Sequence, residues 1–398
     1  MGYTEITAVK GMRNDVGPER FALGDLLYAR NVDIDESGKI DRRQGTSVLF
    51  AGAAHSVWTD GTQGFFVQGG SLKQFQQDGS TLALSPVAGA RVCYASINES
   101  VFWSDNIASG IVANNASHQW GITPPGPITP QSGLGALPPG TYLCTMTFAD
   151  HNGKESGAPR SSSTMTEGSL IFTNLPVSPD PRVALKNIYV SAVDGELPML
   201  TAIIENSVTS LTITDLPEQT LPVRTMFMGP PPPGQIVGYF NGRAYIATGP
   251  FLFYSQPYEY ELFDLRTGFL AFDSDVQTFC AMQDGIFVGT TAKTVFLDGT
   301  GPESFISKPA SPYGTVMGTE VKVSGDAVGA GVDGVGDGQG IAGTMYFWMS
   351  RRGLVLGADG GLVKDLTAKH FVPPVSTSGA ALLKWRTGTP QYVVSLSK

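Results

Sequence analysis

Short apolar runs that end at Gly, Asn or Asp recur along nearly the whole chain. Because these turn residues let the backbone reverse direction within a few positions, the pattern predicts many short antiparallel strands. The strongest single signal is Asn241-Gly242, which lies between the apolar runs 235–240 and 243–247, since both central residues of such a tight hairpin must tolerate positive φ. The chain is therefore expected to belong to the all-β class.

The composition also indicates a low helix content. The 398 residues include 49 Gly and 27 Pro, and only 15% are charged, whereas long surface helices draw on Glu, Lys and Arg for their exposed faces. A chain of this length can bury a core that needs neither disulfides nor metal. Cys93, Cys144 and Cys280 are widely spaced, odd in number and without a CxxC pair, which favours buried thiols over a disulfide framework or a zinc site.

The charge balance disfavours sequence-specific binding of nucleic acid. There are 26 Lys and Arg against 35 Asp and Glu, for a net charge of −9, and no long basic run is present to neutralise phosphates. A conduit for DNA is a different case, because an acidic lumen repels phosphates and lets DNA slide. Residues 1–14 lack the apolar segment of a secretory signal, and no stretch approaches the ~20 apolar residues of a spanning helix, so cytoplasmic synthesis and assembly are expected.

The apolar runs group into five predicted units of hairpin-connected strands. The units lie at 56–84, 90–116, from 235 onward, 276–297 and 343–366. Three of them share an apolar residue, one or two aromatics and then Ser: Val101-Phe102-Trp103-Ser104, Leu252-Phe253-Tyr254-Ser255 and Tyr346-Phe347-Trp348-Met349-Ser350. Four-stranded units repeated at intervals of roughly 25 to 45 residues predict a β-propeller. The alternative is one or two ordinary β-sandwiches.

The middle of the chain has a different composition. Pro clusters at 123–127 and 230–233 act as stiff connectors on either side of it. Strands are expected between them at 140–149, 169–173, 184–192, 199–205 and 210–214, a spacing that suits a small β-sandwich. The first of these alternates apolar and polar positions, as a strand with one buried face does. We therefore predict a β-propeller in two parts, 1–122 and 229–398, with a sandwich inserted at 123–228.

Three stretches resemble the tail-nozzle proteins of short-tailed bacteriophages (podoviruses). The first is Gly24-Asp25-Leu26-Leu27-Tyr28-Ala29-Arg30-Asn31-Val32-Asp33-Ile34-Asp35, followed by Gly38-Lys39-Ile40 and Arg42-Arg43-Gln44-Gly45. The second runs from Pro232-Pro233-Gly234 through Asn241-Gly242-Arg243 to Phe253-Tyr254-Ser255-Gln256-Pro257. The third is Arg352-Gly353-Leu354-Val355-Leu356-Gly357 with Gly360-Gly361-Leu362-Val363 and Asp365-Leu366-Thr367. The inserted sandwich is similar to a fibronectin type III module.

The resemblance covers about a third of the chain and implies a structural virion protein. It implies a β-propeller subunit that forms a homo-oligomeric ring, expected to be a hexamer, in the phage tail. Such a ring lies below the tail adaptor protein, extends the DNA-ejection channel and supports tail needle, fibre or spike proteins. Genomic DNA then passes without sequence-specific binding. The expected interface or channel residues are Arg42 and Arg43, which could pair with acidic residues on a neighbour, and Asp326, Asp333 and Asp337 in the Gly-rich segment 325–343.

Two motifs of the sequence suggest chemistry that their context argues against. Asp33, Asp35 and Ser37 with the central Gly38 follow the ligand spacing of a calcium-binding EF-hand loop, but Gln44 replaces its bidentate Glu, so a simple hairpin turn is preferred. Gly329-x-Gly331-x-x-Gly334 has the letters of a dinucleotide fingerprint, yet the residues after it are too rich in Gly and Asp to begin a helix. No cofactor, metal or catalytic residue is therefore predicted.

Two other functions remain open on the sequence. The main competitor is a propeller that binds carbohydrate or protein through its insert. The third is a propeller glycosidase that would use paired carboxylates, for which the acidic candidates are Glu259, Glu261, Asp264, Asp273 and Asp275. The chain lacks a sialidase-type repeat, so we expect a protein that is not an enzyme.

Overall fold

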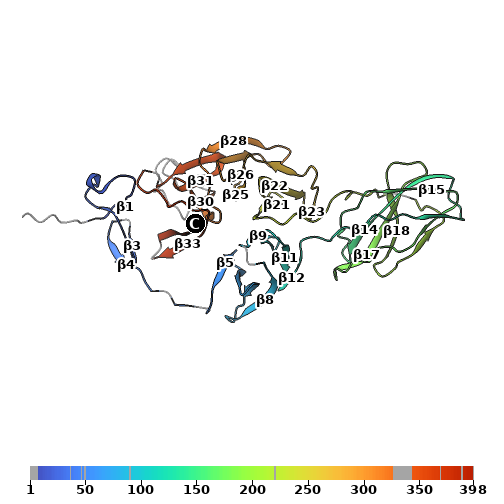
Figure 1. Ribbon diagram of the computed structural model, residues 1–398, viewed down its shortest axis with the longest axis horizontal. Helices are drawn as coiled ribbons and strands as arrows, with labels where there is room; N and C mark the ends of the chain where they lie inside the picture. The colour runs from blue at the N-terminus through green and yellow to red at the C-terminus, as the bar shows by residue number, and fades with distance from the viewer. Residues whose placement is uncertain are drawn as a thin grey trace, which may run out of the picture. The chain divides into compact units, whose positions relative to one another are not determined.

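The structure is a computed structural model that describes residues 8–35, 37–45, 47–48, 51–88, 91–218, 221–325, 343–367, 369–386 and 389–397. Strands dominate it, and the helical turns η1 (Pro18–Arg20) and η2 (Asp359–Gly361) have three residues each (Figure 1). The predicted all-β class is confirmed. The chain forms two compact units, one made of Leu72–Ala271 and the other of Met1–Ser71 with Phe272–Lys398.

Two sheets of the unit Leu72–Ala271 share one apolar core. The first has the order β12-β11-β10-β9, built from β9 (Cys93–Ile97), β10 (Ser100–Ser104), β11 (Ser109–Ala113) and β12 (Ala116–Gln119). The second has the order β20-β21-β22-β23, built from β20 (Ile236–Phe240), β21 (Arg243–Thr248), β22 (Phe251–Gln256) and β23 (Glu259–Phe263), with β24 (Phe269–Ala271) paired to β22. Phe102 of β10 and Trp120, which directly follows β12, pack with Ile246 and Phe263 from the second sheet.

The predicted hairpin at Asn241-Gly242 is confirmed. β20 and β21 pair in register up to Phe240 and Arg243 on either side of the turn. The φ angles of Asn241 and Gly242 are 43° and 78°, so both central residues occupy the left-handed region that this two-residue turn requires. The local sequence was sufficient to fix this connection.

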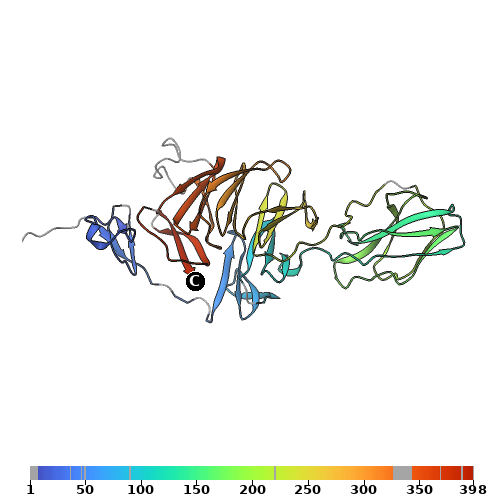
Figure 2. The same ribbon diagram turned by 45° about the horizontal axis from the view of Figure 1, so that its top comes forward.

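The same unit contains two further sheets that pack face to face as a sandwich. One has the order β13-β16-β19, from β13 (Gln131–Gly133), β16 (Ser169–Phe172) and β19 (Leu211–Ile213). The other has the order β15-β14-β17-β18, from β14 (Gly140–Asp150), β15 (Ser162–Thr166), β17 (Val183–Val190) and β18 (Met199–Glu205). All five strands predicted here are present within a residue or two, and Figure 2 shows the paired sheets in green.

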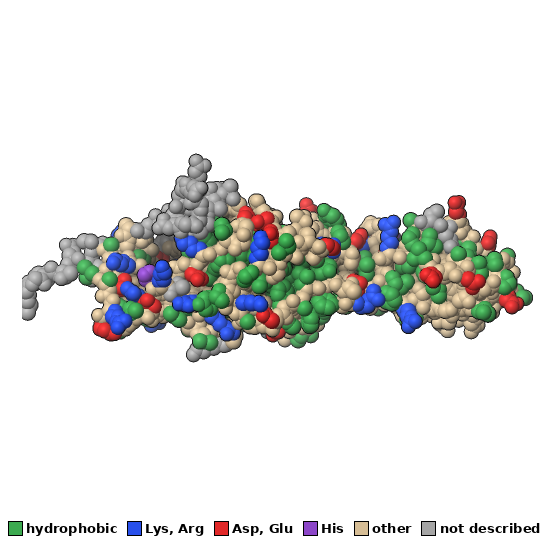
Figure 3. Space-filling model, turned by 90° about the horizontal axis from the view of Figure 1, so that it is seen from above, with side chains coloured by type: hydrophobic (Ala, Val, Ile, Leu, Met, Phe, Trp, Pro, Cys, Tyr) green, Lys and Arg blue, Asp and Glu red, His purple; other side chains and the backbone are tan. Residues whose placement is uncertain are grey.

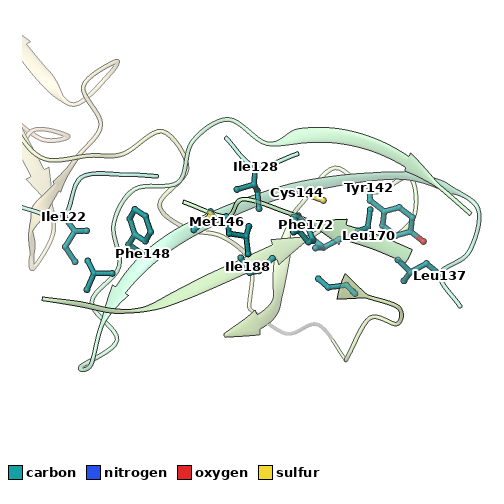
Figure 4. Packing of buried hydrophobic residues seen from close by; sticks show 14 residues of the cluster. Ile122, Ile128, Leu137, Tyr142, Cys144, Met146, Phe148, Leu170, Phe172 and Ile188 are labelled. Carbon is teal, nitrogen blue, oxygen red and sulfur yellow. The ribbon is translucent and has the colours of Figure 1, made fainter. Parts of the chain in front are cut away.

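The predicted apolar positions of the longest sandwich strand are buried, but its other face is buried as well, since Thr145 and Thr147 are also fully buried. Tyr142, Cys144 and Met146 are fully buried, and Phe148 is nearly so. They meet Leu170 and Phe172 of β16 and Ile188 of β17, with side chains from both sheets directed into the space between them (Figure 4). Burial raises the pKa of the Cys144 thiol to about 12, so this thiol acts as a small apolar side chain.

A four-stranded sheet in chain order is formed by β5 (Ala54–Thr59), β6 (Gly64–Gln68), β7 (Ser71–Phe75) and β8 (Thr81–Pro86). Its connections fall at Asp60-Gly61, Gly69-Gly70 and Asp78-Gly79, as the sequence predicts. The side chains of Phe65, Phe66 and Val67 in β6 are buried. This meander, a sheet whose strands follow one another in chain order, is the first of the predicted units, 56–84.

The unit of Met1–Ser71 with Phe272–Lys398 contains two more four-stranded meanders. They are β25 (Val276–Ala281), β26 (Gly285–Thr290), β27 (Thr294–Asp298) and β28 (Ile306–Ser311), and β29 (Val321–Ser324), β30 (Thr344–Ser350), β31 (Gly353–Ala358) and β32 (Leu362–Asp365). Phe287, Phe296, Trp348 and Val355 pack between them. Cys280 is buried in the same core, and burial raises the pKa of its thiol well above the ordinary value. Cys93 is half-buried, and none of the three cysteines forms a disulfide in the described part of the chain.

Three two-stranded sheets complete this unit. β1 (Gly11–Met12) pairs in parallel with β2 (Asp25–Leu26), and β3 (Val32–Ile34) pairs antiparallel with β4 (Ile40–Arg42). Near the end of the chain β33 (Ser378–Arg386) pairs antiparallel with β34 (Thr389–Ser397). None of the helices in the described residues is long and apolar enough to cross a membrane.

A buried hydroxyl recurs where the second strand of a meander enters its turn. Ser350 Oγ donates to Gly353 O at 3.0 Å and accepts from Arg352 N at 3.1 Å. Thr290 Oγ1 donates to Lys293 O at 3.0 Å, and Ser104 Oγ donates to Ala108 O at 3.1 Å. All three are fully buried or nearly so. Ser104 and Ser350 of the repeated sequence signature therefore form hydrogen bonds with backbone groups of the turn. Thr290 makes the equivalent hydrogen bond in a meander where the sequence did not show the signature.

The third Ser of that signature has a different role. Ser255 Oγ accepts from Ala244 N at 3.0 Å and donates to Gln256 O at 2.9 Å. It therefore links neighbouring strands β21 and β22 instead of closing a turn. Of the three Ser residues in the signature, only Ser104 and Ser350 therefore have equivalent structural roles.

Candidate functional site

The first candidate site is the N-terminal arm, which we define as the described residues from 8 to 45. Its strand pairs are joined by backbone hydrogen bonds of 2.9 Å from Val9 N to Gly38 O and 2.8 Å from Lys10 N to Gly24 O. Gly38 has φ of 79°, and a Cβ added there would lie 2.7 Å from the nitrogen of Val9. Glycine is therefore required where the arm's two strand pairs approach each other.

Charged side chains bind the first half of the arm together. Arg13 Nε donates to Asp15 Oδ1 at 2.8 Å and Arg13 Nη1 to Asp25 Oδ2 at 3.2 Å. Asp25 also accepts from Ala22 N at 2.9 Å, and this backbone hydrogen bond is the largest cause that lowers the pKa of Asp25. The arm thus depends on polar contacts for its shape.

The arm has no apolar core of its own among its described residues. Only Gly24, Asp33 and Gly38 are buried there. Leu27 and Tyr28 are 61% and 69% exposed. The arm is therefore structured without a buried apolar side chain among its described residues.

Arg42 is the last residue of β4 and Arg43 follows it, and the two differ in their contacts. Arg43 Nε donates to Asp33 Oδ1 at 3.0 Å within the same hairpin, and its side chain remains 51% exposed. Asp33 and Asp41 are directly opposite each other in the pairing of β3 with β4, and such like-charge pairs are unfavourable. The positive charge of Arg43 therefore reduces the electrostatic repulsion between Asp33 and Asp41. Arg42 is exposed on the surface of the arm. The predicted pairing of these arginines with a neighbouring subunit stays a prediction.

The predicted hairpin turn is present between β3 and β4. Asp35 Oδ1 accepts from Ser37 Oγ at 2.6 Å and from Lys39 N at 2.8 Å, so it closes the turn between β3 and β4. The hydrogen bond from Ser37 is the largest cause that lowers the pKa of Asp35. A strand follows the turn where an EF-hand requires a helix. No cluster of His, Cys, Asp or Glu suited to a metal ion occurs in the described part of the chain.

Three of the predicted channel residues lie outside the described residues. These are Asp326, Asp333 and Asp337, and the dinucleotide-like string that begins at Gly329 lies in the same segment. Their predicted place at an interface or channel stays a prediction.

Three of the five acidic residues considered for glycosidase chemistry take part in separate local contacts. Asp264 accepts from Arg266 and Thr267 in the turn after β23, and Asp273 pairs with Lys293 at 2.7 Å. Glu261, whose side chain is 9% exposed, pairs with Lys154 Nζ at 2.5 Å. Each of these three carboxylates has a structural partner.

Glu261 belongs to a charged cluster that joins the sandwich to β12 and β23. Arg182 Nη1 approaches Glu261 Oε2 at 3.4 Å and His118 Nδ1 at 3.2 Å, and Arg182 Nη2 donates to Asp180 Oδ2 at 2.7 Å and to Gly121 O at 3.1 Å. Burial acts to lower the pKa of Arg182, but its hydrogen bond with Asp180 and the nearby carboxylates outweigh that and raise it. No sequence signal could have identified this cluster, because Arg182 and Glu261 are 79 residues apart.

An open cleft on the sandwich is the second candidate site. It has a volume of about 470 Å³ and is lined by residues that include Leu143, Arg160, Glu196, Met226 and Phe227. The ring of Phe227 is 41% exposed and carries the Arg266 guanidinium 4.1 Å from its centroid. Apolar walls with one acidic and one basic side chain suit a small polar ligand or a peptide.

Comparisons with known proteins assign no family. No family model matches the chain, and no curated protein matches it. Similar solved structures include the extracellular domain of a one-component system from B. thetaiotaomicron (11% identity, TM-score 0.32, 92% of this chain and 44% of that chain covered) and puromycin hydrolase (11%, 0.21, 84% and 56%). The chain thus spans about half the length of these structures. At such TM-scores the likeness assigns neither a fold family nor an activity.

Proposed function

We propose that the chain is a structural subunit of a short phage tail, in which copies form a homo-hexameric nozzle ring that extends the DNA-ejection channel. The proposal includes a β-propeller with an inserted fibronectin type III-like sandwich. The ring lies below the tail adaptor and supports needle, fibre or spike proteins. Its role is architectural and requires no catalytic step.

The repeated meanders support the propeller part of the proposal. Three four-stranded sheets keep strict chain order and close the same turn with a buried Ser or Thr, as repeats of one structural unit do. Their shared cores contain large aromatic side chains such as Trp120 and Trp348. The seven-stranded sandwich between β12 and β20 supports the inserted module.

The exposure of the N-terminal arm is the main observation that supports assembly of the chain into a ring. The segment 24–45 resembles the opening of nozzle proteins, and it is structured by hydrogen bonds without burying an apolar side chain of its own. Subunits of a ring complete one another in this way, since each covers a surface that its neighbour exposes.

The surface charge is compatible with a passive DNA conduit. On the face shown in Figure 3, both Lys and Arg (blue) and Asp and Glu (red) are present. Together with the net charge of −9, this favours weak contact with passing phosphates over tight binding.

Two measurements test the proposal. Light scattering after size-exclusion chromatography of the full chain, alone and with the tail adaptor, is expected to give a ring mass of six copies. Mass spectrometry and antibody labelling of purified virions are expected to place the chain at the tail. A chain that stays monomeric with the adaptor and is missing from virions would reject the nozzle function.

The cleft on the sandwich favours a second candidate, a module that binds carbohydrate or protein. Arg160 and Glu196 offer both charge signs beside the exposed Phe227. Binding of the wild-type chain to a glycan array, lost in Phe227→Ala, would favour this function. The chain would then also be monomeric and missing from virions, which distinguishes this function from the ring.

A further inference from the structure

Three tyrosines lie close together in the sheet β20-β21-β22-β23. Tyr239 belongs to β20, Tyr260 to β23, and Tyr258 to the turn between β22 and β23. The rings of Tyr239 and Tyr260 meet edge-on, with 5.9 Å between their centroids. Asn98, in the turn between β9 and β10, approaches the hydroxyl of Tyr260 with its Nδ2 at 3.5 Å. We call these four residues the tyrosine surface.

Tyr258 is placed beside the other two tyrosines by the turn Asn241-Gly242. Its backbone N donates to Gly242 O at 2.7 Å. Its ring lies over that glycine, because a Cβ added to Gly242 would be 3.0 Å from ring carbons of Tyr258. Burial raises the pKa of the Tyr260 hydroxyl, and both its hydrogen bond with Tyr239 and the nearby Tyr258 raise it further. The three phenol groups therefore lie near one another.

The tyrosine surface is held by an apolar core on one side and is open on the other. Tyr260 is half-buried, because it packs against the core that this sheet shares with β9, β10, β11 and β12. Tyr239 and Tyr258 are 36% and 76% exposed. Tyr presents a large, rigid and amphipathic contact area at a low cost in conformational entropy, and it is enriched where proteins bind a partner. The exposed rings are therefore suited to a binding role.

The backbone of Tyr258 does not favour a Tyr at this position. Pro257 precedes it, and the φ angle of Tyr258 is 60°. A turn in which Pro is followed by a residue of positive φ normally takes Gly or Asn there, since a bulky side chain at positive φ costs conformational energy. Residues held in such conformations are concentrated at sites that bind ligands. Tyr258 is both strained and exposed, and the turn needs neither property.

The chemistry of the tyrosine surface indicates a neutral, polyhydroxylated ligand. After burial, the groups that shift the pKa of Tyr260 most are the other two tyrosines and Asn98, and all of these are uncharged at neutral pH. An anion would need cations there, whereas the flanking Glu99 and Glu259 are acidic. An ammonium ligand would need carboxylates directed at the rings. A sugar needs neither, because its C–H face packs on an aromatic ring while its hydroxyls bond to phenol and amide groups.

We propose that the tyrosine surface binds a neutral oligosaccharide of pyranose units. One sugar ring stacks on the exposed ring of Tyr258, and neighbouring hydroxyls bond to the phenol of Tyr239 and the amide of Asn98. The site shares no residue with the cleft on the sandwich. It involves binding alone, without a chemical step, and it does not depend on the proposed ring.

Saturation-transfer difference NMR on the full chain tests the inference, because it detects sugar C–H protons in contact with the protein. The probes are maltohexaose, cellohexaose, chitohexaose and mannohexaose, with choline chloride as the cationic probe. At least one hexasaccharide is expected to bind through its ring protons, and choline is expected not to bind. If no hexasaccharide binds, or if only choline binds, the inference is wrong.

Tyr258→Gly separates loss of binding from loss of folding. Glycine adopts a φ of 60° without strain, so the urea midpoint is not expected to fall. The affinity for the hexasaccharide is expected to fall about tenfold or more. Tyr28→Ala, at a 69% exposed position of the N-terminal arm, is the matched control and is expected to bind as wild type does. Unchanged binding by Tyr258→Gly, with binding lost in Phe227→Ala, would assign the sugar to the cleft and overturn the inference.

Light scattering distinguishes a sugar-binding surface from a contact between protein chains. Tyr258→Gly is expected to have the same mass as wild type, both alone and with the tail adaptor. A changed mass, together with a wild type that binds no hexasaccharide, would assign the tyrosines to a protein contact. That result would overturn this inference and leave the nozzle function standing. A wild type that binds the sugar but is monomeric and missing from virions would support this inference and reject the nozzle.

Discussion

The indole nitrogen of Trp120 donates a hydrogen bond of 2.8 Å to the backbone oxygen of Tyr260, 140 residues further along the chain. The Trp120 side chain is fully buried, and its ring meets those of Phe102 and Phe263 edge-on at centroid distances of 5.0 and 6.0 Å. Trp120 directly follows β12, and Tyr260 lies in β23. One side chain thus links two sheets that flank the inserted sandwich.

We expect Trp120→Phe to destabilise the protein by about 1–3 kcal/mol. The substitution removes the donor to Tyr260 O, leaves that buried acceptor without its partner and opens space beside Phe263. The urea midpoint measured by circular dichroism is expected to fall. Trp58→Phe, at a half-exposed position of β5, is the control and is expected to leave the midpoint nearly unchanged. Equal shifts in the two variants would contradict the role assigned to Trp120.

We expect Ser350→Ala to cost about 1–3 kcal/mol, because the turn groups Arg352 N and Gly353 O then lose their buried partner. Ser350→Thr retains the hydroxyl and is expected to cost less. Thermal unfolding followed by calorimetry measures both, with Ser307→Ala at an exposed site as the control. A neutral Ser350→Ala would show that the repeated hydroxyl is not needed for the turn.

We expect Gly357→Ala to cost about 1–3 kcal/mol through overpacking. A Cβ at residue 357 would lie 2.5 Å from the Trp348 ring and 3.0 Å from the Phe287 ring, between two packed sheets. Gly126→Ala, where nothing lies within 4 Å of the added Cβ, is the matched control. The difference between the two variants in urea denaturation measures the packing cost, and the absence of a difference would refute it.

The stability of the unit that contains His118 is expected to fall as the pH drops below about 6.5. Burial and the charge of Arg182 lower the folded-state pKa of His118 below its ordinary value of 6.5. The unfolded state therefore binds a proton first, so stability is present above the unfolded pKa and is lost as the pH falls from 6.5 toward the folded pKa. Urea midpoints at pH 7 and pH 5 measure this loss.

His118→Gln is the variant for this pH dependence, because it removes the titrating ring. It is expected to reduce the fall in midpoint between pH 7 and pH 5, whereas His55→Gln, at an exposed position, is expected to leave that fall unchanged. The same slope in His118→Gln as in wild type would assign the pH dependence to other groups.

Much of the fold follows from local sequence, as particular elements demonstrate. Asn241-Gly242 specifies its own turn, because only residues that tolerate positive φ fit there. The alternation from Tyr142 to Phe148 specifies the apolar face of β14, because side chains alternate along a strand, but it did not predict that Thr145 and Thr147 on the other face are buried too. The turn at Asp35 was likewise predictable, since an Asp two residues before Ser37 can accept from the backbone that follows.

The contacts of the candidate site residues could be predicted from the sequence less well than the fold. Arg42 and Arg43 were predicted as equivalent interface residues, but the side chains of neighbouring strand residues face opposite ways, and Arg43 meets Asp33. The cluster of Arg182 and Glu261 gave no signal, because its members are polar residues at unremarkable positions in separate strands and loops.

The sequence by itself determined the strands, their turns and the all-β class, because each depends on backbone preferences and periodicity within a few residues. Only the tertiary structure decided which sheets share a core, which hydroxyls close equivalent turns, and that the arm and the pair of β33 with β34 leave apolar side chains exposed. Those features depend on pairs of residues that are distant in sequence, and the burial of a side chain is fixed by what the rest of the chain places against it.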